Sequence, residues 1–170
     1  MRIDKMPGEE YGEVQAKGGN VMLGYYKNEE ATREAFTEDG WFKTGDIGYI
    51  DKEGYIVLTG RKKNVIILSN GKNIFPEELE EYIGRIPYVK ESVVLGRRNA
   101  KGDLVVAAVV VPDMEKLGDT PREEIEEKIN AAVREINDKL PTYKHMNIVE
   151  VRYEEFEKST TKKILRYKIK

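Results

Sequence analysis

The 170-residue sequence contains no cysteine, and this absence removes several classes of chemistry. Without a thiol the chain has no disulfide framework, no thiolate nucleophile and no sulfur-ligated metal site. The single histidine, His145, excludes a histidine-based triad and a multi-histidine metal site within this chain. We therefore expect His145 to be a structural or exposed residue.

Long apolar runs are missing as well. The longest, Leu104 to Val111, is far too short to span a bilayer, and no signal-peptide pattern opens the sequence. Lysine and arginine (29) nearly balance aspartate and glutamate (31), so no global field favours nucleic acid or a membrane. Because 39% of the residues are hydrophobic, the chain can bury a real core. These features predict a soluble cytoplasmic protein.

The most informative stretch runs from Trp41 to Glu80 and holds two polar clusters, at 44–46 and 60–63. A turn signal at 51–54 lies between apolar segments and predicts a β-hairpin that brings the two clusters together. An aspartate opposed by an arginine can accept hydrogen bonds from the vicinal hydroxyls of a ribose while the arginine donates to them. An ordinary surface ion pair beside a turn explains the same residues.

Hydrophobic periodicity predicts the remaining elements. Asn28 is expected to cap a helix that packs on a larger body, and Thr120 to open a capping box with Pro121 as first helical residue. The apolar run from residue 104 predicts a strand covered on both faces. Residues 64–151 then form a small α+β domain. Strands are expected at 13–17, 20–24, 64–68, 92–96, 104–111 and 147–151, and helices at 28–36, 76–86 and 121–140.

In this order the segments resemble the adenylate-forming superfamily of acyl-CoA synthetases, luciferases and peptide-synthetase adenylation domains. The resemblance rests on Gly12–Phe36 (GEVQAKGGNVMLGYYKNEEATREAF), on the run Trp41–Glu80 and on the tail Glu157–Lys168 (EKSTTKKILRYK). It implies an α+β fold, in which a small mobile lid domain has a short sheet flanked by helices. Residues 1–62 would be the β-rich tail end of the large N-terminal AMP-binding domain, and residues 63–170 the C-terminal lid.

The resemblance also assigns roles to individual residues. Asp46 would bind the ribose hydroxyls of the nucleotide with help from Arg61, and Lys63 would be the hinge that absorbs the rotation of the lid. Gly71 would line the CoA channel, where a side chain would obstruct the thin pantetheine arm, although turn chemistry explains a glycine equally well. Lys163 would enter the site for adenylation and neutralise charge between the carboxylate and the α-phosphate.

The basic tail departs from the family pattern at one position. Most relatives have glycine before the adenylation lysine, whereas Lys162 precedes Lys163 here. This variant is similar to the long-chain fatty acid branch, and it leaves Lys162 as an alternative working residue. By composition alone the tail also fits a solvated face or an anion-binding patch, since residues 158–170 contain no acid and six basic residues: Lys158, Lys162, Lys163, Arg166, Lys168 and Lys170.

The implied activity is that of an acyl-CoA ligase, which joins a carboxylic or fatty acid to CoA with ATP and Mg²⁺ and releases AMP and pyrophosphate. The Ser/Thr/Gly-rich loop for the ATP phosphates and the acyl pocket do not occur in this sequence. We therefore expect a C-terminal fragment of an enzyme of fatty acid metabolism, inactive by itself, with no bound cofactor and no metal ligands of its own.

The expected partners are the missing N-terminal domain, the acid, ATP and CoA, with weak peripheral membrane association and no nucleic acid. Two alternatives stay open. One is a non-catalytic module that binds anions, nucleic acid or an acidic membrane through its basic tail. The other is an adenylation domain that serves a carrier protein. The identity of the acid, the acceptor and the oligomeric state cannot be read from these residues.

Overall fold

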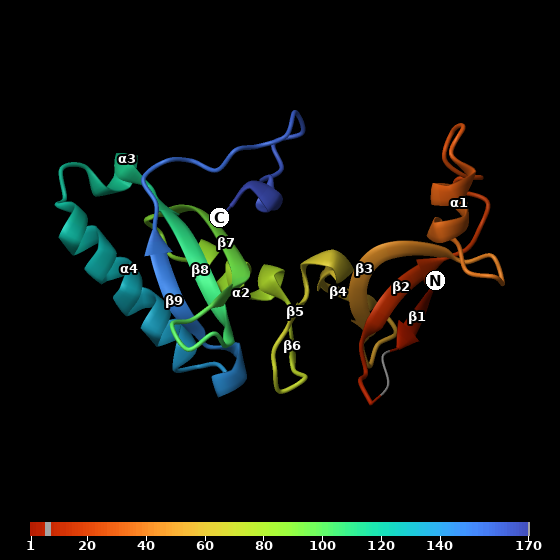
Figure 1. Ribbon diagram of the computed structural model, residues 1–170, viewed down its shortest axis with the longest axis horizontal. Helices are drawn as coiled ribbons and strands as arrows, with labels where there is room; N and C mark the ends of the chain where they lie inside the picture. Colours follow the sequence, from red (N-terminus) through yellow and green to blue (C-terminus); the bar gives the residue numbers. More distant parts are fainter. Residues whose placement is uncertain (6–7, 170) are drawn as a thin grey trace. The chain divides into compact units, whose positions relative to one another are not determined.

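The computed structural model describes residues 1–5 and 8–169, so Lys170 of the basic tail lies outside the described residues (Figure 1). The chain forms two compact units, Met1–Val65 and Ile66–Lys170. The first unit is β-rich, and the second combines a sheet with helices, so the predicted α+β class is confirmed. Among the described residues, no helix combines the length and apolarity needed to cross a membrane.

The first unit is built on a four-stranded antiparallel sheet in the order β1-β2-β3-β4. The predicted hairpin is its second half, and the Asp51 carboxylate stabilises the connecting turn by accepting hydrogen bonds from two backbone N–H groups, of Glu53 (3.0 Å) and Tyr55 (2.8 Å). The strands are β1 (Arg2–Lys5), β2 (Gly12–Ala16), β3 (Phe42–Ile50) and β4 (Ile56–Arg61).

One strand of this unit was missed and one prediction was wrong. β1 was not predicted, because its residues RIDK carry no apolar alternation and its pairing with β2 comes from the sheet. The strand predicted at 20–24 is instead a series of turns and bends. Leu23 is fully exposed there, so the apolar residues of that stretch do not mark a buried face.

The helix α1 (Glu29–Ala35) begins as predicted, since the Asn28 side chain accepts a hydrogen bond of 3.0 Å from the Ala31 N–H. It ends at Ala35, well before Gly40, because Phe36 is extended and pairs with Phe42. No residue of α1 is buried within this chain.

The second unit has a three-stranded sheet in which β8 pairs antiparallel with β7 and parallel with β9. A parallel pair needs a crossover connection, which the helices α3 and α4 provide. A two-stranded hairpin, β5-β6, precedes this sheet. The elements are β5 (Ile66–Ile67), β6 (Asn73–Ile74), α2 (Pro76–Gly84), β7 (Val89–Arg98), β8 (Leu104–Pro112), α3 (Met114–Leu117), α4 (Arg122–Asn137) and β9 (Met146–Val151).

The strand β8 is covered on both faces, as its apolar sequence predicted. One face packs with the buried residues of α2 and α4 in the main core, and α4 lies alongside β9 (Figure 1). The opposite face, with Val109 and Val111, packs against Phe156 at the start of the C-terminal tail. Ile164 and Ile169, later in the tail, add to this second core.

Several predicted boundaries shift for identifiable reasons. Thr120 does not cap α4, because its hydroxyl donates a 2.6 Å hydrogen bond to the Leu117 carbonyl at the end of α3. Pro121 is instead the N-cap, and α4 begins one residue later than predicted. The strand predicted at 64–68 shortens to β5, because residues 62–64 form a 3₁₀ turn. The helix α2 ends at Gly84, two residues before the predicted end.

Candidate functional site

The strands β3 and β4 bring the two polar clusters of the first unit together. Asp46 lies directly opposite Arg61 in the register, and the Asp46 Oδ1 is 3.0 Å from the Arg61 Nη1. The side chains remain 30% and 48% exposed, respectively. A carboxylate has about four acceptor sites and a guanidinium five N–H donors, so both groups keep capacity for a ligand.

The backbone around Asp46 is shaped by its neighbours in the TGD cluster. The Thr44 hydroxyl donates to the Val14 carbonyl (2.8 Å) and accepts from the Asp46 N–H (3.0 Å). Gly45 has a φ of 73°, a left-handed conformation that favours glycine. This turn directs the Thr44 carbonyl to the Arg61 Nη1, at 3.1 Å, so that one guanidinium nitrogen holds both ends of the cluster.

The structure adds Glu13, a residue that the sequence analysis did not single out. This β2 side chain is buried, with only 7% of it exposed. Its Oε1 accepts from the Gly45 N–H (3.1 Å), and its Oε2 is 2.7 Å from the Lys62 Nζ. A buried carboxylate needs such partners. Glu13 therefore ties the cluster that carries Asp46 to the one that carries Arg61.

Lys63 and Gly71 lie in short connecting segments. Lys63 is exposed in the 3₁₀ turn at 62–64, two residues before the division between the units after Val65. Gly71 has a φ of 78°, and a Cβ there would meet no atom within 4 Å. The backbone conformation thus accounts for glycine at this position without a ligand. The hinge role of Lys63 and the channel role of Gly71 remain predictions.

In the second unit, Lys163 lies at the end of a small hairpin loop in the tail. An antiparallel bridge joins Lys158 to Ile164, the Ser159 N–H donates to the Lys163 carbonyl (2.8 Å), and the Lys163 N–H donates to the Ser159 Oγ (3.2 Å). Lys162 has a φ of 61°. Lysine thus occupies the left-handed position of the loop, the conformation that glycine adopts most easily.

The acids that surround the tail pair with three of its basic residues. Lys158 pairs with Glu91 and with Glu155, at 3.0 Å from the latter. Hydrogen bonds from Lys90 and Lys158 lower the pKa of the exposed Glu155 carboxyl to about 2. Two further ion pairs join Arg166 to Glu80 and Lys168 to Glu157.

Lys162 and Lys163 differ from these tail residues. Both are exposed, and neither has an ion-pair partner among residues 1–5 and 8–169. The tail is therefore not a uniform basic surface, because its free ammonium groups are concentrated at the loop.

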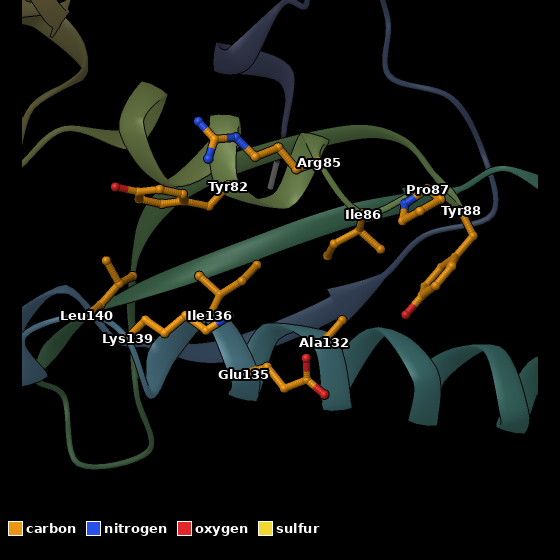
Figure 2. A pocket seen from close by; sticks show the side chains of 10 residues that line it. All are labelled: Tyr82, Arg85, Ile86, Pro87, Tyr88, Ala132, Glu135, Ile136, Lys139 and Leu140. Atoms are coloured by element: carbon orange, nitrogen blue, oxygen red, sulfur yellow. The ribbon is translucent and has the colours of Figure 1, made fainter.

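A groove of about 480 Å³ lies between α2 and α4 (Figure 2). Its lining is mainly apolar and aromatic, with charged side chains at the rim. It is lined by Tyr82, Arg85, Ile86, Pro87, Tyr88, Ala132, Glu135, Ile136, Lys139 and Leu140. Nearby, the half-buried His145 directs its Nε2 to the Leu140 carbonyl at 3.1 Å, which fits the structural role expected of it.

One family of known proteins covers the second unit and the residues just before it. The AMP-binding enzyme C-terminal domain matches residues 63–170. This chain belongs to that family. Among its curated relatives, the long-chain-fatty-acid–CoA ligase FadD15 of Mycobacterium tuberculosis is 49% identical over half of the chain. The 2-succinylbenzoate–CoA ligase of Bacillus cytotoxicus is 36% identical over all of it.

Solved structures of related enzymes extend the likeness to both units. The o-succinylbenzoate coenzyme A synthetase MenE of Bacillus subtilis, in complex with ATP and magnesium ion, matches 94% of this chain with a TM-score of 0.75 and 31% identity. ATP-bound MatB of Rhodopseudomonas palustris matches 95% with a TM-score of 0.74 and 32% identity. The chain spans 14% of FadD15, 33% of the Bacillus cytotoxicus ligase and 30% of each structure.

Proposed function

We propose that this chain is the C-terminal part of an ATP-dependent acid–CoA ligase. Residues 1–62 would be the tail end of its large AMP-binding domain and residues 63–170 its C-terminal lid. The family match supports this proposal, as do relatives named as CoA ligases and structural neighbours solved with ATP. In this reading Asp46 and Arg61 contact the nucleotide, Lys63 is the hinge, Gly71 lines the CoA channel and Lys163 serves adenylation.

The observation that carries the proposal is which basic residues of the tail have acidic partners. Three of the described basic residues around the loop have acidic partners, whereas Lys163 is exposed and has none among the described residues. Its ammonium group is therefore available to neutralise the charge that builds between the carboxylate and the α-phosphate in the transition state.

The ion pair in the first unit fits a ribose. Asp46 uses one oxygen on Arg61 and is partly exposed, so its remaining lone pairs can accept hydrogen bonds from vicinal hydroxyls. The Arg61 Nη1 contacts the Asp46 carboxylate and the Thr44 carbonyl, and the other N–H groups of the guanidinium can donate hydrogen bonds to a ligand. Glu13 holds the cluster in this arrangement before a nucleotide binds.

ATP, when bound, supplies the activated phosphate, Mg²⁺ neutralises phosphate charge and CoA supplies the accepting thiol. Among the described residues, no group of three or more acidic or histidine side chains is arranged to hold a metal ion. The chemistry proposed for this chain is that of Asp46, Arg61 and Lys163.

The acid is proposed only by class. The relatives are named for long-chain fatty acids, sulfoacetate and 2-succinylbenzoate, which differ widely in size and charge. Lys162 in place of glycine favours a long-chain fatty acid. The alternative of an anion-binding tail is weakened by the ion pairs of Lys158, Arg166 and Lys168. A carrier-protein acceptor and weak membrane association stay as predictions.

The test is Lys163→Ala in the full-length enzyme. Acyl-adenylate formation should fall by roughly 10²- to 10³-fold, the usual cost of one lost charge donor. Thioester formation from supplied acyl-adenylate should persist. Pyrophosphate release and CoA consumption report the two steps separately, and Lys162→Ala is the matched control with both steps retained. An equal loss in both steps with Lys163→Ala would contradict the proposal.

A further inference from the structure

The segment that follows the Lys163 loop is fixed to two elements of the second unit by one side chain. Arg166 lies three residues after Lys163. Its Nη2 contacts the Glu80 carboxylate on α2, and its Nη1 donates a hydrogen bond of 3.1 Å to the Val94 carbonyl on β7. Glu80 completes the link, because its Oε1 accepts from the Val94 N–H at 2.6 Å. A helix, a strand and the tail therefore meet at Glu80.

The ion pair at this junction is largely buried. The side chains of Glu80 and Arg166 are 17% and 29% exposed. Burial raises the pKa of the Glu80 carboxyl above its ordinary value, against the opposing effects of Arg166 and the Val94 N–H, and the Glu77 charge adds to the rise. A buried ion pair of this kind can fix the geometry of the groups that it joins.

The other side of the loop is anchored too. Lys158 pairs with Glu91 on β7, and the Glu91 Oε2 accepts from the Phe156 N–H at 3.2 Å. Ile164, directly after Lys163, packs partly buried on the second core. Both stems of the loop are therefore fixed to the sheet, while residues 160–163 at its tip are exposed.

We propose that Glu80 and Arg166 are positioning residues, whose ion pair holds the loop in the orientation from which Lys163 acts in adenylation. The inference rests on the adenylation role proposed above for Lys163. Neither residue needs to touch the nucleotide. Displacement of a catalytic group by about 1 Å can cost roughly 10²-fold in rate, so a loosened anchor should lower the adenylation rate without weakening substrate binding.

Glu80→Gln, Arg166→Gln and the double variant in the full-length enzyme test this inference. Glutamine at 80 keeps an oxygen for the Val94 N–H and removes only the charge. Each single variant should lower kcat for adenylation by about 10- to 10²-fold, with KM for ATP and acid within about twofold. The double variant should lose no more than the worse single one, because both changes break the same link. Arg166→Lys should recover part of the loss.

Two readouts separate positioning from general damage. Thioester formation from supplied acyl-adenylate should stay unchanged, and trypsin should cleave faster after Lys162 and Lys163, because local opening exposes the loop backbone. Glu157→Gln is the matched control, since it breaks the exposed pair with Lys168 in the same tail. Glu157→Gln should change neither the adenylation rate nor the rate of thioester formation.

The outcomes are distinguishable with Lys163→Ala measured in parallel. If Lys163→Ala lowers adenylation while Glu80→Gln and Arg166→Gln stay within about twofold of the parent, the positioning role is wrong and the proposed function stands. If the Glu80 and Arg166 variants lose both half-reactions equally, their role is structural and the inference is overturned. If Lys163→Ala has no effect, the adenylation role proposed for Lys163 is wrong and the inference fails with it.

Discussion

At the scale of single residues, the two adjacent lysines of the loop have different backbones and hence different constraints. Lys162 has a φ of 61°, and a side chain in this left-handed region costs about 1–2 kcal/mol. Glycine avoids most of that strain, which gives a physical reason for the glycine that the family pattern has at this position. Lys163 carries no such strain, because its φ is not positive.

Lys162→Gly should therefore stabilise the second unit by up to about 1 kcal/mol and leave adenylation unchanged. Thermal unfolding and pyrophosphate release measure the two effects. Thr160→Gly is the control, because Thr160 lies in the same loop without a positive φ and should gain no stability. Loss of adenylation in Lys162→Gly would instead identify Lys162 as the working lysine.

Asp46 permits a second test at this scale. Asp46→Asn in the full-length enzyme removes the negative charge from the Arg61 pair, and hydrogen bonds to charged groups contribute about 1.5–3 kcal/mol. ATP affinity should fall by about 10- to 10²-fold, as measured by calorimetric titration. Asp51→Asn, in the turn of the same hairpin, should bind ATP like the parent. Equal affinities in both variants would remove Asp46 from the nucleotide site.

At the scale of elements, local patterns located most of the fold. Short local patterns of periodicity and turn residues predicted four features: the β3-β4 hairpin, α2, α4 and the doubly covered β8. β1 was missed because its place in the sheet depends on β2 and not on its own charged sequence. The sequence at Thr120 matches a capping box, but the Thr120 hydroxyl donates its hydrogen bond to the Leu117 carbonyl instead.

The candidate site shows the same division. Asp46 and Arg61 were predictable as neighbours because one short turn joins their strands. Glu13 and Glu80 were not, since an acid in a strand or a helix is typical of an exposed face. Their partners lie far along the chain, Lys62 at 49 residues from Glu13 and Arg166 at 86 residues from Glu80. A pattern of local spacing contains no information on such pairs.

The Glu80 link also has a definite pH behaviour. Burial raises the pKa of the Glu80 carboxyl in the folded state above its ordinary value of 4.5. As the pH rises above 4.5, the unfolded chain therefore releases the Glu80 proton before the folded chain does. The contribution of Glu80 to stability therefore declines as pH rises from there through its folded pKa. Ionisation of the Glu80 carboxyl is thus less favourable in the folded chain than in the unfolded one.

At the scale of the whole molecule, each unit has its own buried residues. Val14 and Ile47 are buried in the first unit, and Ile129 lies in the main core of the second. The single tryptophan, Trp41, belongs to the first unit. Its fluorescence therefore reports unfolding of that unit, whereas the far-ultraviolet signal of α2 and α4 reports the second.

Ile129→Ala should destabilise the second unit by about 2–5 kcal/mol, because it leaves a cavity under α4. In urea, the circular dichroism transition should move to lower concentration while the Trp41 fluorescence transition stays in place. Lys128→Ala, the exposed neighbour on the same helix, should move neither. A common shift of both signals would show that the units unfold as one.

The second core also bears on how this chain can be shortened. Ile164 and Ile169 help to cover Val93, Val109 and Val111 on the outer face of the β7-β8 sheet. A chain cut after Glu157 would lose these two isoleucines along with the loop lysines and would leave valines open to water, a surface prone to self-association. Loss of anion binding after such a cut would first reflect aggregation. Point substitutions in the loop avoid this problem and separate effects on catalysis from effects on solubility.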